Sequence, residues 1–465
     1  MKTVTITLLF YFGCIHAQQG GWEKFYNNNG AVRAHDIKPT SDGGYIMTGF
    51  SNPTGTFFGH DVMLMKINSE GDFEWSMNFD AADGSDQGYE VIETFSGGFA
   101  LVGLASTPSS FGGGGVFILT DFQGNLIKQD FYGGEIDGDR LHGIKQTPLD
   151  SGFVLVGVSG NPPFLVRTDK HGDTLFTKRY DDLVGVFQAV ACSEDGEFLY
   201  LAGYTGVQNK SIMMKVNLNG EVIWHESYID VGAEELYALT MHGDYVVASG
   251  RATKADPTEP AEFHTRVINT ENGQTVSLNH YGNSNSSVFN SIDVTHDNGL
   301  IMVGTRHLGS LGSKVYVVKS DFQGELIWEH EFGQSPVLSS GRGICKGHDY
   351  GYMVCGHTNI NGSAHVYVIK IDENGSVVST NSFPFLPEIS LYPNPCSEVL
   401  NIQLGTFESE KRITVFNNAG QEVYHLTTLD NEIQINEVGF WQSGVYLVHV
   451  EVEGHKVVRK VVVGN

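Results

Sequence analysis

The chain has 465 residues, of which 40% are apolar and only 18% are charged, and 57 positions are glycine. This composition excludes a disordered chain and favours short strands joined by tight turns. A net charge of −26 repels phosphate backbones and argues against nucleic-acid binding, while it is compatible with cation binding or with solubility outside the cell.

Residues 1–17 have the features of a secretory signal peptide. Lys2 gives a basic start, Val4–Ile15 is almost wholly apolar, and Ala17 is a small residue at a cleavage point. The apolar run is too short to span a bilayer, and no later segment is long and apolar enough to cross a membrane as a helix. We therefore expect a protein that is secreted.

A repeat of about fifty residues follows. Its first half is a glycine-containing turn, a short apolar strand and a closing glycine. Seven closing glycines, separated by 54, 54, 46, 47, 54 and 52 residues, stand at Gly49, Gly103, Gly157, Gly203, Gly250, Gly304 and Gly356.

The second half of the repeat is an apolar strand that ends in an Asp/Asn-x-x-Gly turn. The Asx side chain caps such a turn, and glycine takes the positive φ that lets the next strand return. Four residues after the glycine stand Trp75, Trp224 and Trp328, which are three of the five tryptophans, with Phe176 in a fourth copy.

Each unit therefore supplies four short strands, and seven such units predict a seven-bladed β-propeller over residues 18–383. The outermost strand of the closing blade has two candidates, Trp22–Tyr26 and Val377–Phe383, and the sequence leaves both open. The run from Trp75 through Gly97-Gly98-Phe99 to Asp121-Phe122-Gln123-Gly124 resembles the seven-bladed β-propeller repeat of many secreted bacterial proteins. That resemblance implies a fold far more than an activity.

One face of the ring should carry loops of variable length, because the first-to-second and third-to-fourth connections are tight turns on the other face. Such loops are either a binding surface or tolerated insertions. The candidate binding residues on this rim are Asp83, Asp86, Asp137, Asp139 and Arg140. Acidic pairs bind calcium or serve as a glycosidase acid and base. However, no dense calcium-loop pattern is present, and Asp83 and Asp137 recur in adjacent units as loop caps do. We therefore predict no catalytic residue, no cofactor and no metal ligand, with calcium left open.

Two further sets of residues recur between units. We interpret the strand-terminal cations as solvated strand ends, and the histidines as turn residues. They are Lys66, Arg167, Lys215, Lys319 and Lys370, and His242, His296 and His348. Cys345 and Cys355 flank a hairpin turn, where they form either a cross-strand disulfide or two buried thiols. No cysteine or histidine spacing suggests zinc.

Residues 384–388 read as a short, stiff linker, and residues 389–465 as a small immunoglobulin-like β-sandwich. Strands are expected at 400–404, 412–417, 421–426, 432–435, 444–452 and 455–463.

Three motifs occur in order in this last segment: Leu391-Tyr392-Pro393-Asn394-Pro395, Ser443-Gly444-Val445-Tyr446-Leu447-Val448 and Lys456–Val463. Together they resemble the type A sorting domain of the type IX (Por) secretion system. The resemblance implies translocation across the outer membrane, recognition by the export machinery, and removal of the domain with transfer to a surface anchor. The residues that would carry the signal are Pro393, Asn394, Pro395, Gly444, Tyr446, Lys456, Arg459 and Lys460.

These observations predict a secreted or surface-bound interaction protein whose propeller binds an extracellular protein or glycan. The alternative is an extracellular polysaccharide hydrolase, or another propeller enzyme, acting at the same rim.

Overall fold

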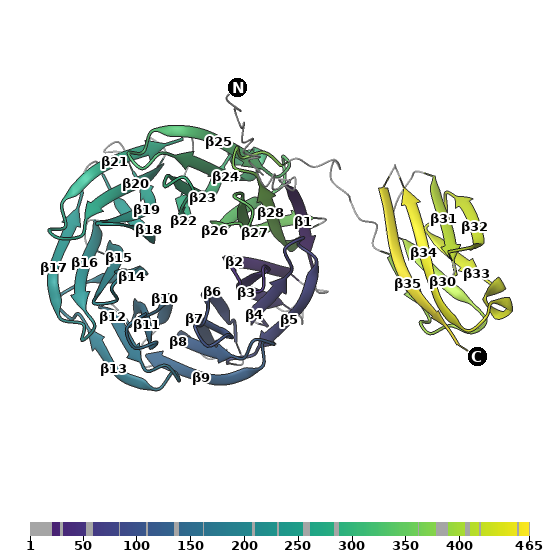
Figure 1. Ribbon diagram of the computed structural model, residues 1–465, viewed down its shortest axis with the longest axis horizontal. Helices are drawn as coiled ribbons and strands as arrows, with labels where there is room; N and C mark the ends of the chain where they lie inside the picture. Colours follow the sequence, from purple (N-terminus) through teal and green to yellow (C-terminus); the bar gives the residue numbers. More distant parts are fainter. Residues whose placement is uncertain are drawn as a thin grey trace, which may run out of the picture. The chain divides into compact units, whose positions relative to one another are not determined.

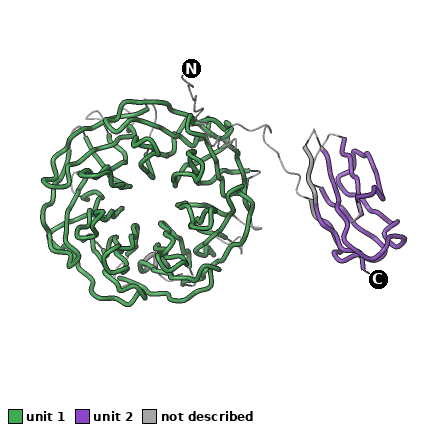
Figure 2. Tube along the Cα trace, viewed as in Figure 1, with its two compact units in different colours: residues 1–379 green, residues 380–465 purple. Residues whose placement is uncertain are grey.

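The computed structural model describes most of the chain after residue 20. The described ranges are 21–27, 31–52, 59–82, 84–107, 110–133, 139–160, 162–206, 210–229, 232–253, 261–282, 288–360, 362–377, 389–404, 410–417, 420–452 and 455–464. The chain divides into two compact units, Met1–Ser379 and Thr380–Asn465 (Figure 2). Within these ranges no helix is long and apolar enough to cross a membrane.

Unit 1 is a ring of seven antiparallel sheets of four strands each, and it confirms the predicted seven-bladed β-propeller (Figure 1). Blade 1 contains β2 (Ala31–Pro39), β3 (Tyr45–Asn52), β4 (Asp61–Ile67) and β5 (Phe73–Phe79), and blade 2 contains β6 (Gln87–Glu93), β7 (Phe99–Thr107), β8 (Ser110–Thr120) and β9 (Leu126–Gly133). Blade 3 contains β10 (Arg140–Gln146), β11 (Phe153–Val158), β12 (Pro163–Thr168) and β13 (Thr174–Arg179), and blade 4 contains β14 (Gly185–Cys192), β15 (Phe198–Thr205), β16 (Ser211–Asn217) and β17 (Val222–Tyr228). Blade 5 contains β18 (Glu234–His242), β19 (Tyr245–Ala252), β20 (Glu262–Asn269) and β21 (Thr275–Tyr281). Blade 6 contains β22 (Val288–Val294), β23 (Leu300–His307), the short 3-10 helix η1 (Gly309–Leu311), β24 (Ser313–Ser320) and β25 (Leu326–Phe332). Blade 7 contains β26 (Ser339–Lys346), β27 (Tyr352–Ile360), β28 (Ser363–Ile371) and the N-terminal strand β1 (Trp22–Tyr26).

The N-terminal strand closes the ring. β1 pairs antiparallel with β28 along its whole length, with Trp22 opposite Lys370 and Tyr26 opposite Val366. Of the two candidates, Trp22–Tyr26 is thus the outermost strand of blade 7, whereas residues 378–388 lie outside the described residues. The start of the propeller is thereby joined to its last blade, which closes the ring.

The repeated tryptophans pack on the Asx turn of the next blade. Trp75 lies opposite Lys66 in blade 1, and its ring packs on the Asx-turn glycine of blade 2, where a β-carbon on Gly124 would approach it to 2.7 Å. Trp22 takes the same position opposite Lys370, and a β-carbon on Gly71 of blade 1 would lie 2.3 Å from its ring. Glycine is thus required in these turns both for positive φ and for the neighbouring indole.

The seven closing glycines have a different role. In every blade the innermost strand contains one extra residue, a β-bulge, beside its closing glycine. A β-carbon on any of these glycines would lie 1.8–2.0 Å from a carbonyl oxygen of the innermost strand. The close approach of two backbones at the bulge therefore explains why glycine recurs at this position of every blade.

Four of the five strand-terminal cations are buried, so the interpretation as solvated strand ends was wrong for them. The fifth, Lys215, is partly exposed and donates to the carbonyl of Thr270 at 3.1 Å. Lys66 is 2% exposed, and its Nζ lies 3.0 Å from Asp42 and 3.1 Å from Glu74. Three other blades repeat a buried cation paired with an aspartate of the first-to-second turn: Arg167–Asp150, Lys319–Asp297 and Lys370–Asp349. The turn aspartate compensates the desolvated charge, which sequence spacing alone does not reveal.

Cys345 and Cys355 are separate buried thiols. They are not opposite each other, because Cys345 faces Met353 while Cys355 faces Gly343. Burial raises the pKa of both thiols, so they behave as small apolar core residues. Of the two alternatives for this pair, the structure contains the buried thiols.

Unit 2 is a small β-sandwich, as predicted. One sheet contains β29 (Ile389–Tyr392), β30 (Leu400–Leu404) and β33 (Glu432–Ile435), and the other contains β32 (Glu422–Thr428), β31 (Lys411–Phe416), β34 (Gly444–Val452) and β35 (His455–Val463), with a 3-10 helix η2 (Glu437–Phe440). Its core joins both sheets, for example Leu400 and Ile435 with Val448 and Val461. The predicted strands agree with these bounds to within two residues, except that β29 was not predicted.

Candidate functional site

The seven β-bulges form a ring of side chains on the innermost strands. These strands, β2, β6, β10, β14, β18, β22 and β26, surround the centre of the propeller (Figure 1). The bulged residues are His35, Tyr89, His142, Gln188, Tyr237, Asn290 and Arg342. Each is partly exposed, whereas the residue before it is buried. Because a bulge redirects a side chain out of the sheet, we interpret these residues as the polar lining of the ring centre.

Aromatic contacts join the bulged residues of three consecutive blades. The ring of His35 lies 5.7 Å from that of Tyr89, and Tyr89 is stacked on His142 at 5.2 Å. Phe50 extends this series, because its ring lies 5.6 Å from His35 and 4.6 Å from His60. Blades 1 to 3 thus contribute a continuous set of aromatic side chains, which we call the aromatic arc: Phe50, His35, Tyr89 and His142.

Two arginines stand at one end of the aromatic arc. Arg33 lies over the ring of Phe50 at 5.5 Å, and Arg342 is the bulged residue of blade 7. Among the described residues neither guanidinium forms a hydrogen bond or an ion pair, and the Nε atom of each is buried without a partner. Arg140, in contrast, hydrogen-bonds to Tyr89, and Arg251 lies 3.6 Å from Glu235.

The histidines of this region are neutral at neutral pH. Burial, together with the nearby charges of Arg342 and Arg33, lowers the pKa of His35 to about 3. The pKa of His357 is also lowered to about 3 by burial and by the same two arginines. Burial and the charge of Arg140 lower the pKa of His142 to about 3 as well. The positive charge therefore belongs to the arginines.

The other half of the ring is differently composed. Tyr237 donates a hydrogen bond to Glu235, which also pairs with Arg251. Asn290 donates to the carbonyl of Gly341 at 2.6 Å. The charge of Arg251 is therefore compensated by Glu235, although its Nε atom, like those of Arg33 and Arg342, forms no hydrogen bond.

Two of the predicted rim residues are buried. Asp86 is 0% exposed and accepts hydrogen bonds from the backbone N–H groups of Ala81, Ala82 and Ser106, at 2.7, 2.8 and 2.9 Å. Asp139, at the equivalent place in blade 3, is 1% exposed and bonds the N–H of Gly160. The rim prediction was wrong for both, because each carboxylate is consumed in holding its loop. Burial raises the pKa of Asp86 to about 6.

The remaining rim predictions have different outcomes. Asp83 and Asp137 lie outside the described residues. Arg140 is half-buried and lies beside the aromatic arc rather than at the surface. Within the ranges that the structure describes, no group of three or more histidines, cysteines, aspartates or glutamates is arranged to hold a metal ion.

The ring of bulged residues was not predicted from the sequence. Their residue types differ from blade to blade, so no motif marks them. Their signal is positional, since each stands 13 to 15 residues before the closing glycine of its blade.

Blade 5 contains a buried ionic cluster that was also missed. Glu234 stands where Asp86 and Asp139 stand in their blades, and it accepts hydrogen bonds from Arg266 at 2.8 and 3.0 Å and from Ser211 at 2.9 Å. His264 Nε2 lies 3.1 Å from the same carboxylate. Burial alone would raise the pKa of Glu234, but its bonds to His264 and Arg266 outweigh burial and lower the pKa to about 2. This cluster is fully enclosed, so its role is structural.

In unit 2 the three sequence motifs meet on the terminal strand. Asn394 donates through Nδ2 to the carbonyl of Lys460 at 3.2 Å and accepts through Oδ1 from the N–H of Val462 at 2.8 Å. β34, which begins at Gly444, pairs along the other edge of β35. The terminal strand is therefore held between the Pro-Asn-Pro segment and the Gly-Val-Tyr strand.

The individual signal residues lie in different environments. Tyr446 is buried, and its hydroxyl bonds the carbonyl of Gln442 at 2.8 Å. Arg459 and Lys460 are exposed, whereas the side chain of Lys456 lies outside the described residues. A β-carbon on Gly444 would meet no close neighbour. Among the described side chains of the terminal strand, Arg459 and Lys460 are therefore the basic groups that a receptor can reach.

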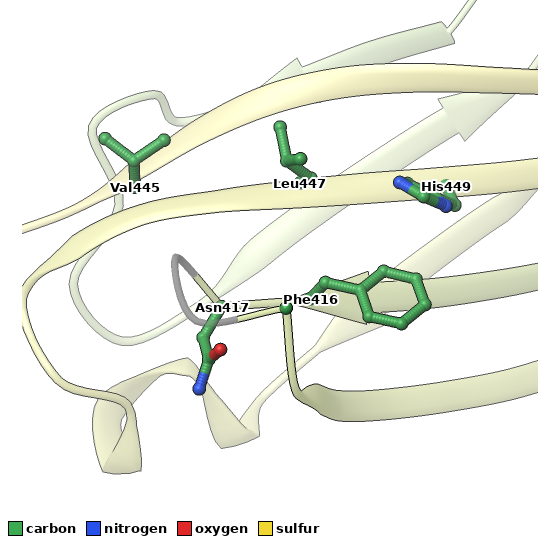
Figure 3. Close-up of a pocket in the computed structure, with 6 residues that line it drawn as sticks. Phe416, Asn417, Val445, Leu447 and His449 are labelled. Carbon is green, nitrogen blue, oxygen red and sulfur yellow. The ribbon is translucent and has the colours of Figure 1, made fainter.

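A shallow apolar groove lies beside Lys460 on the outer face of the same sheet. Figure 3 shows its lining, with Val445, Leu447 and His449 on β34 and Phe416 and Asn417 at the end of β31. Leu447 faces Lys460 across the β34–β35 pair. The groove therefore adjoins the basic terminal strand.

Comparison with known families supports the prediction that the second unit is a sorting domain. Residues 390–464 match the family described as secretion system C-terminal sorting domain. Together, the seven four-stranded blades and this domain define a secreted β-propeller protein with a type IX secretion sorting signal.

A curated relative is the ulvan lyase NLR42 of Nonlabens ulvanivorans. It is 24% identical over 230 residues, which are 49% of this chain and 38% of the relative, so the chain spans well under half of that protein.

Three solved structures are similar, each with a TM-score of 0.44. PorZ, a surface component of the type IX secretion system of Porphyromonas gingivalis, is 13% identical, with 92% of this chain and 59% of that chain covered. The Dos1 propeller is 12% identical over 72% of this chain and 77% of its own. Sqt1 from Chaetomium thermophilum is 10% identical over 78% of this chain and 88% of its own.

Proposed function

We propose that the protein is an extracellular binding protein, whose propeller holds a glycan or protein ligand at the ring of bulged residues. The observation that carries this proposal is the composition of that ring. It combines aromatic side chains with two guanidinium groups that form no hydrogen bond or ion pair among the described residues. Binding sites of this kind combine apolar surface with a few unpaired polar groups.

The same composition argues for binding rather than hydrolysis. Glycoside hydrolysis uses two carboxyl groups on either side of the scissile bond. In the described part of the ring lining, Glu235 stands two residues before a bulge, and it is already engaged by Tyr237 and Arg251. The second candidate, an enzyme that acts on an extracellular polysaccharide, is supported by the similarity to an ulvan lyase over 230 residues.

We further propose that the sorting domain delivers the protein through the type IX machinery to the cell exterior after removal of residues 1–17. Exposed Arg459 and Lys460, in a protein of net charge −26, offer a local positive surface for a receptor. The domain is then the part of the chain that the export machinery recognises.

A glycan array with the mature chain, residues 18–465, tests the binding function. A parallel assay of each bound polysaccharide measures new reducing ends and unsaturated chain ends. Retention without cleavage supports a binding protein. Release of new chain ends, lost when the ring residues are substituted, would replace this proposal with the enzyme.

A further inference from the structure

We propose that the seam between blades 7 and 1 binds the carboxylate or sulfate group of an acidic sugar, held by Arg33 and Arg342. This inference rests on the proposed binding function and names the class of its ligand. Four features carry it: the geometry of the seam, the unpaired charge, the fit of guanidinium to such anions, and the aromatic arc beside it.

The two arginines stand on β2 and β26, which are in contact at the seam, although they are 309 positions apart in the chain. A β-carbon on Gly343 would lie 2.9 Å from Cα of Asp36, so the backbone that follows Arg342 touches the backbone that follows His35. Arg33 stands two residues before His35 on the same strand. His357 lies on β27 opposite Ser340, so it is on the same side of the seam. Ring closure alone brings these residues together.

The charge of the seam is uncompensated. Burial lowers the pKa of Arg342, and the positive charge of Arg33 lowers it as well. Buried Nε atoms of both residues and Nδ1 of His357 have no hydrogen-bond partner. Elsewhere in the propeller, arginines such as Arg167 and Arg306 pair with carboxylates at 2.6 Å. Leaving buried donors unpaired is costly, and the protein has an excess of carboxylates with which to pair them.

A planar guanidinium presents paired N–H donors that match a carboxylate or sulfate. Neutral His35 and His357 add hydrogen-bonding nitrogens without adding charge. On the other side of Arg33, the aromatic arc offers apolar contact for the carbon face of a sugar ring. The opposite half of the ring has no such unpaired charge in the described residues, which places the anion at the seam.

Calorimetric titration of the mature full-length protein tests this assignment with four probes. They are a uronate tetrasaccharide, a sulfated galactan tetrasaccharide, a neutral galactan tetrasaccharide and sodium sulfate. We expect an acidic tetrasaccharide to bind, and its affinity to fall at least tenfold in Arg33→Gln and in Arg342→Gln and below detection in the double variant. Arg342→Lys should recover only part of the affinity, because lysine keeps the charge but loses the paired donors.

Arg179→Gln is the matched control, since it removes one partly exposed guanidinium from blade 3 that already pairs with Asp181. It should leave the affinity unchanged. Thermal unfolding separates binding from folding: removing one of two unpaired cations should leave the melting temperature equal or higher. A lower melting temperature in both glutamine variants would mean that the arginines are structural and would overturn the assignment.

Equal affinity of the double variant for an acidic sugar would also overturn it, as would binding of sulfate ion with no binding of either acidic tetrasaccharide. The proposed function fails separately. A neutral glycan bound independently of both arginines would leave a binding protein without this anion site, whereas absence of any glycan or protein ligand would remove both.

Discussion

Trp22 lies opposite Lys370, the position that Trp75 takes opposite Lys66 within a single blade. Trp22, from the start of the propeller, thus occupies the tryptophan position of blade 7, whose other three strands come from the end of the propeller. Lys24 strengthens the same closure, because its Nζ bonds Asp72 of blade 1 at 3.0 Å. The seam that this closure builds is also the place where Arg33 and Arg342 meet.

Trp22→Ala should destabilise the propeller by about 2–4 kcal/mol, because it removes a large aromatic side chain packed between two blades. Chemical denaturation followed by intrinsic fluorescence measures the loss. Phe122→Ala is the control, since Phe122 is 68% exposed and its truncation should change stability by no more than about 0.5 kcal/mol. Equal losses for both substitutions would contradict a specific role for Trp22 in closure.

Gly203→Ala should cost about 1–3 kcal/mol or prevent folding, because its β-carbon would lie 1.9 Å from the carbonyl oxygen of Val186. Gly206→Ala, three residues later, should be nearly neutral, since its β-carbon meets nothing closer than 3.5 Å. Thermal unfolding of both variants compares them. If Gly203→Ala melts like the wild type, the bulge does not constrain this position.

Glu234→Gln should lower stability by about 3 kcal/mol at pH 7, because it leaves Arg266 buried without a counter-charge. The folded-state pKa of Glu234 is about 2, below its ordinary value. The stabilisation from its ionised form is therefore complete above the ordinary glutamate pKa and is lost as the pH falls from about 4.5 towards 2.

Urea denaturation between pH 2.5 and 7 should accordingly show a steeper acid loss in the wild type than in Glu234→Gln. Glu331→Gln, which breaks the less buried pair with Arg306, should retain the wild-type slope. Parallel curves for wild type and Glu234→Gln would show that this carboxylate does not stay ionised on folding.

Asn394→Ala should destabilise the sorting domain by about 1–3 kcal/mol, because it removes two hydrogen bonds to the backbone of the terminal strand. Hydrogen exchange of the N–H of Val462 should report the change directly. Asn401→Ala, which loses a single exposed bond to the carbonyl of Tyr392, is the milder comparison. Unchanged protection of Val462 in Asn394→Ala would rule out this anchoring role.

Deletion of residues 456–465 should abolish surface display, since it removes the strand to which both other motifs pair. The double substitution Arg459→Gln with Lys460→Gln separates recognition from folding, because both side chains are exposed. It should leave thermal stability unchanged and reduce display in a type IX-secreting host. Arg412→Gln, an exposed arginine on another strand of the same sheet, is the control. Normal display of the truncated chain would contradict the signal assignment.

Much of the fold was predictable because residues that the backbone requires at turns and bulges recur in every repeat. The closing glycines and the Asx turns mark places where only certain residues fit, and such places recur in every blade. The closing strand is different, because Trp22 takes the repeat position of Trp75 but only its pairing with β28 shows that this strand closes the ring.

The candidate site was not predictable in the same way. Asp86 and Asp139 were acidic residues in predicted loops, and nothing in their spacing distinguishes a surface carboxylate from one that accepts buried N–H groups. Lys66 shows the converse, because the aspartate that lets it be buried is 24 residues away.

The sequence by itself determined seven blades, a terminal sandwich and three motifs, because local turn chemistry and strand periodicity are encoded in neighbouring residues. Only the tertiary structure decided which strand closes the ring, where the bulged side chains gather, and that Arg33 meets Arg342. Those outcomes depend on contacts between residues hundreds of positions apart, and side chains of different types occupy equivalent places around the ring.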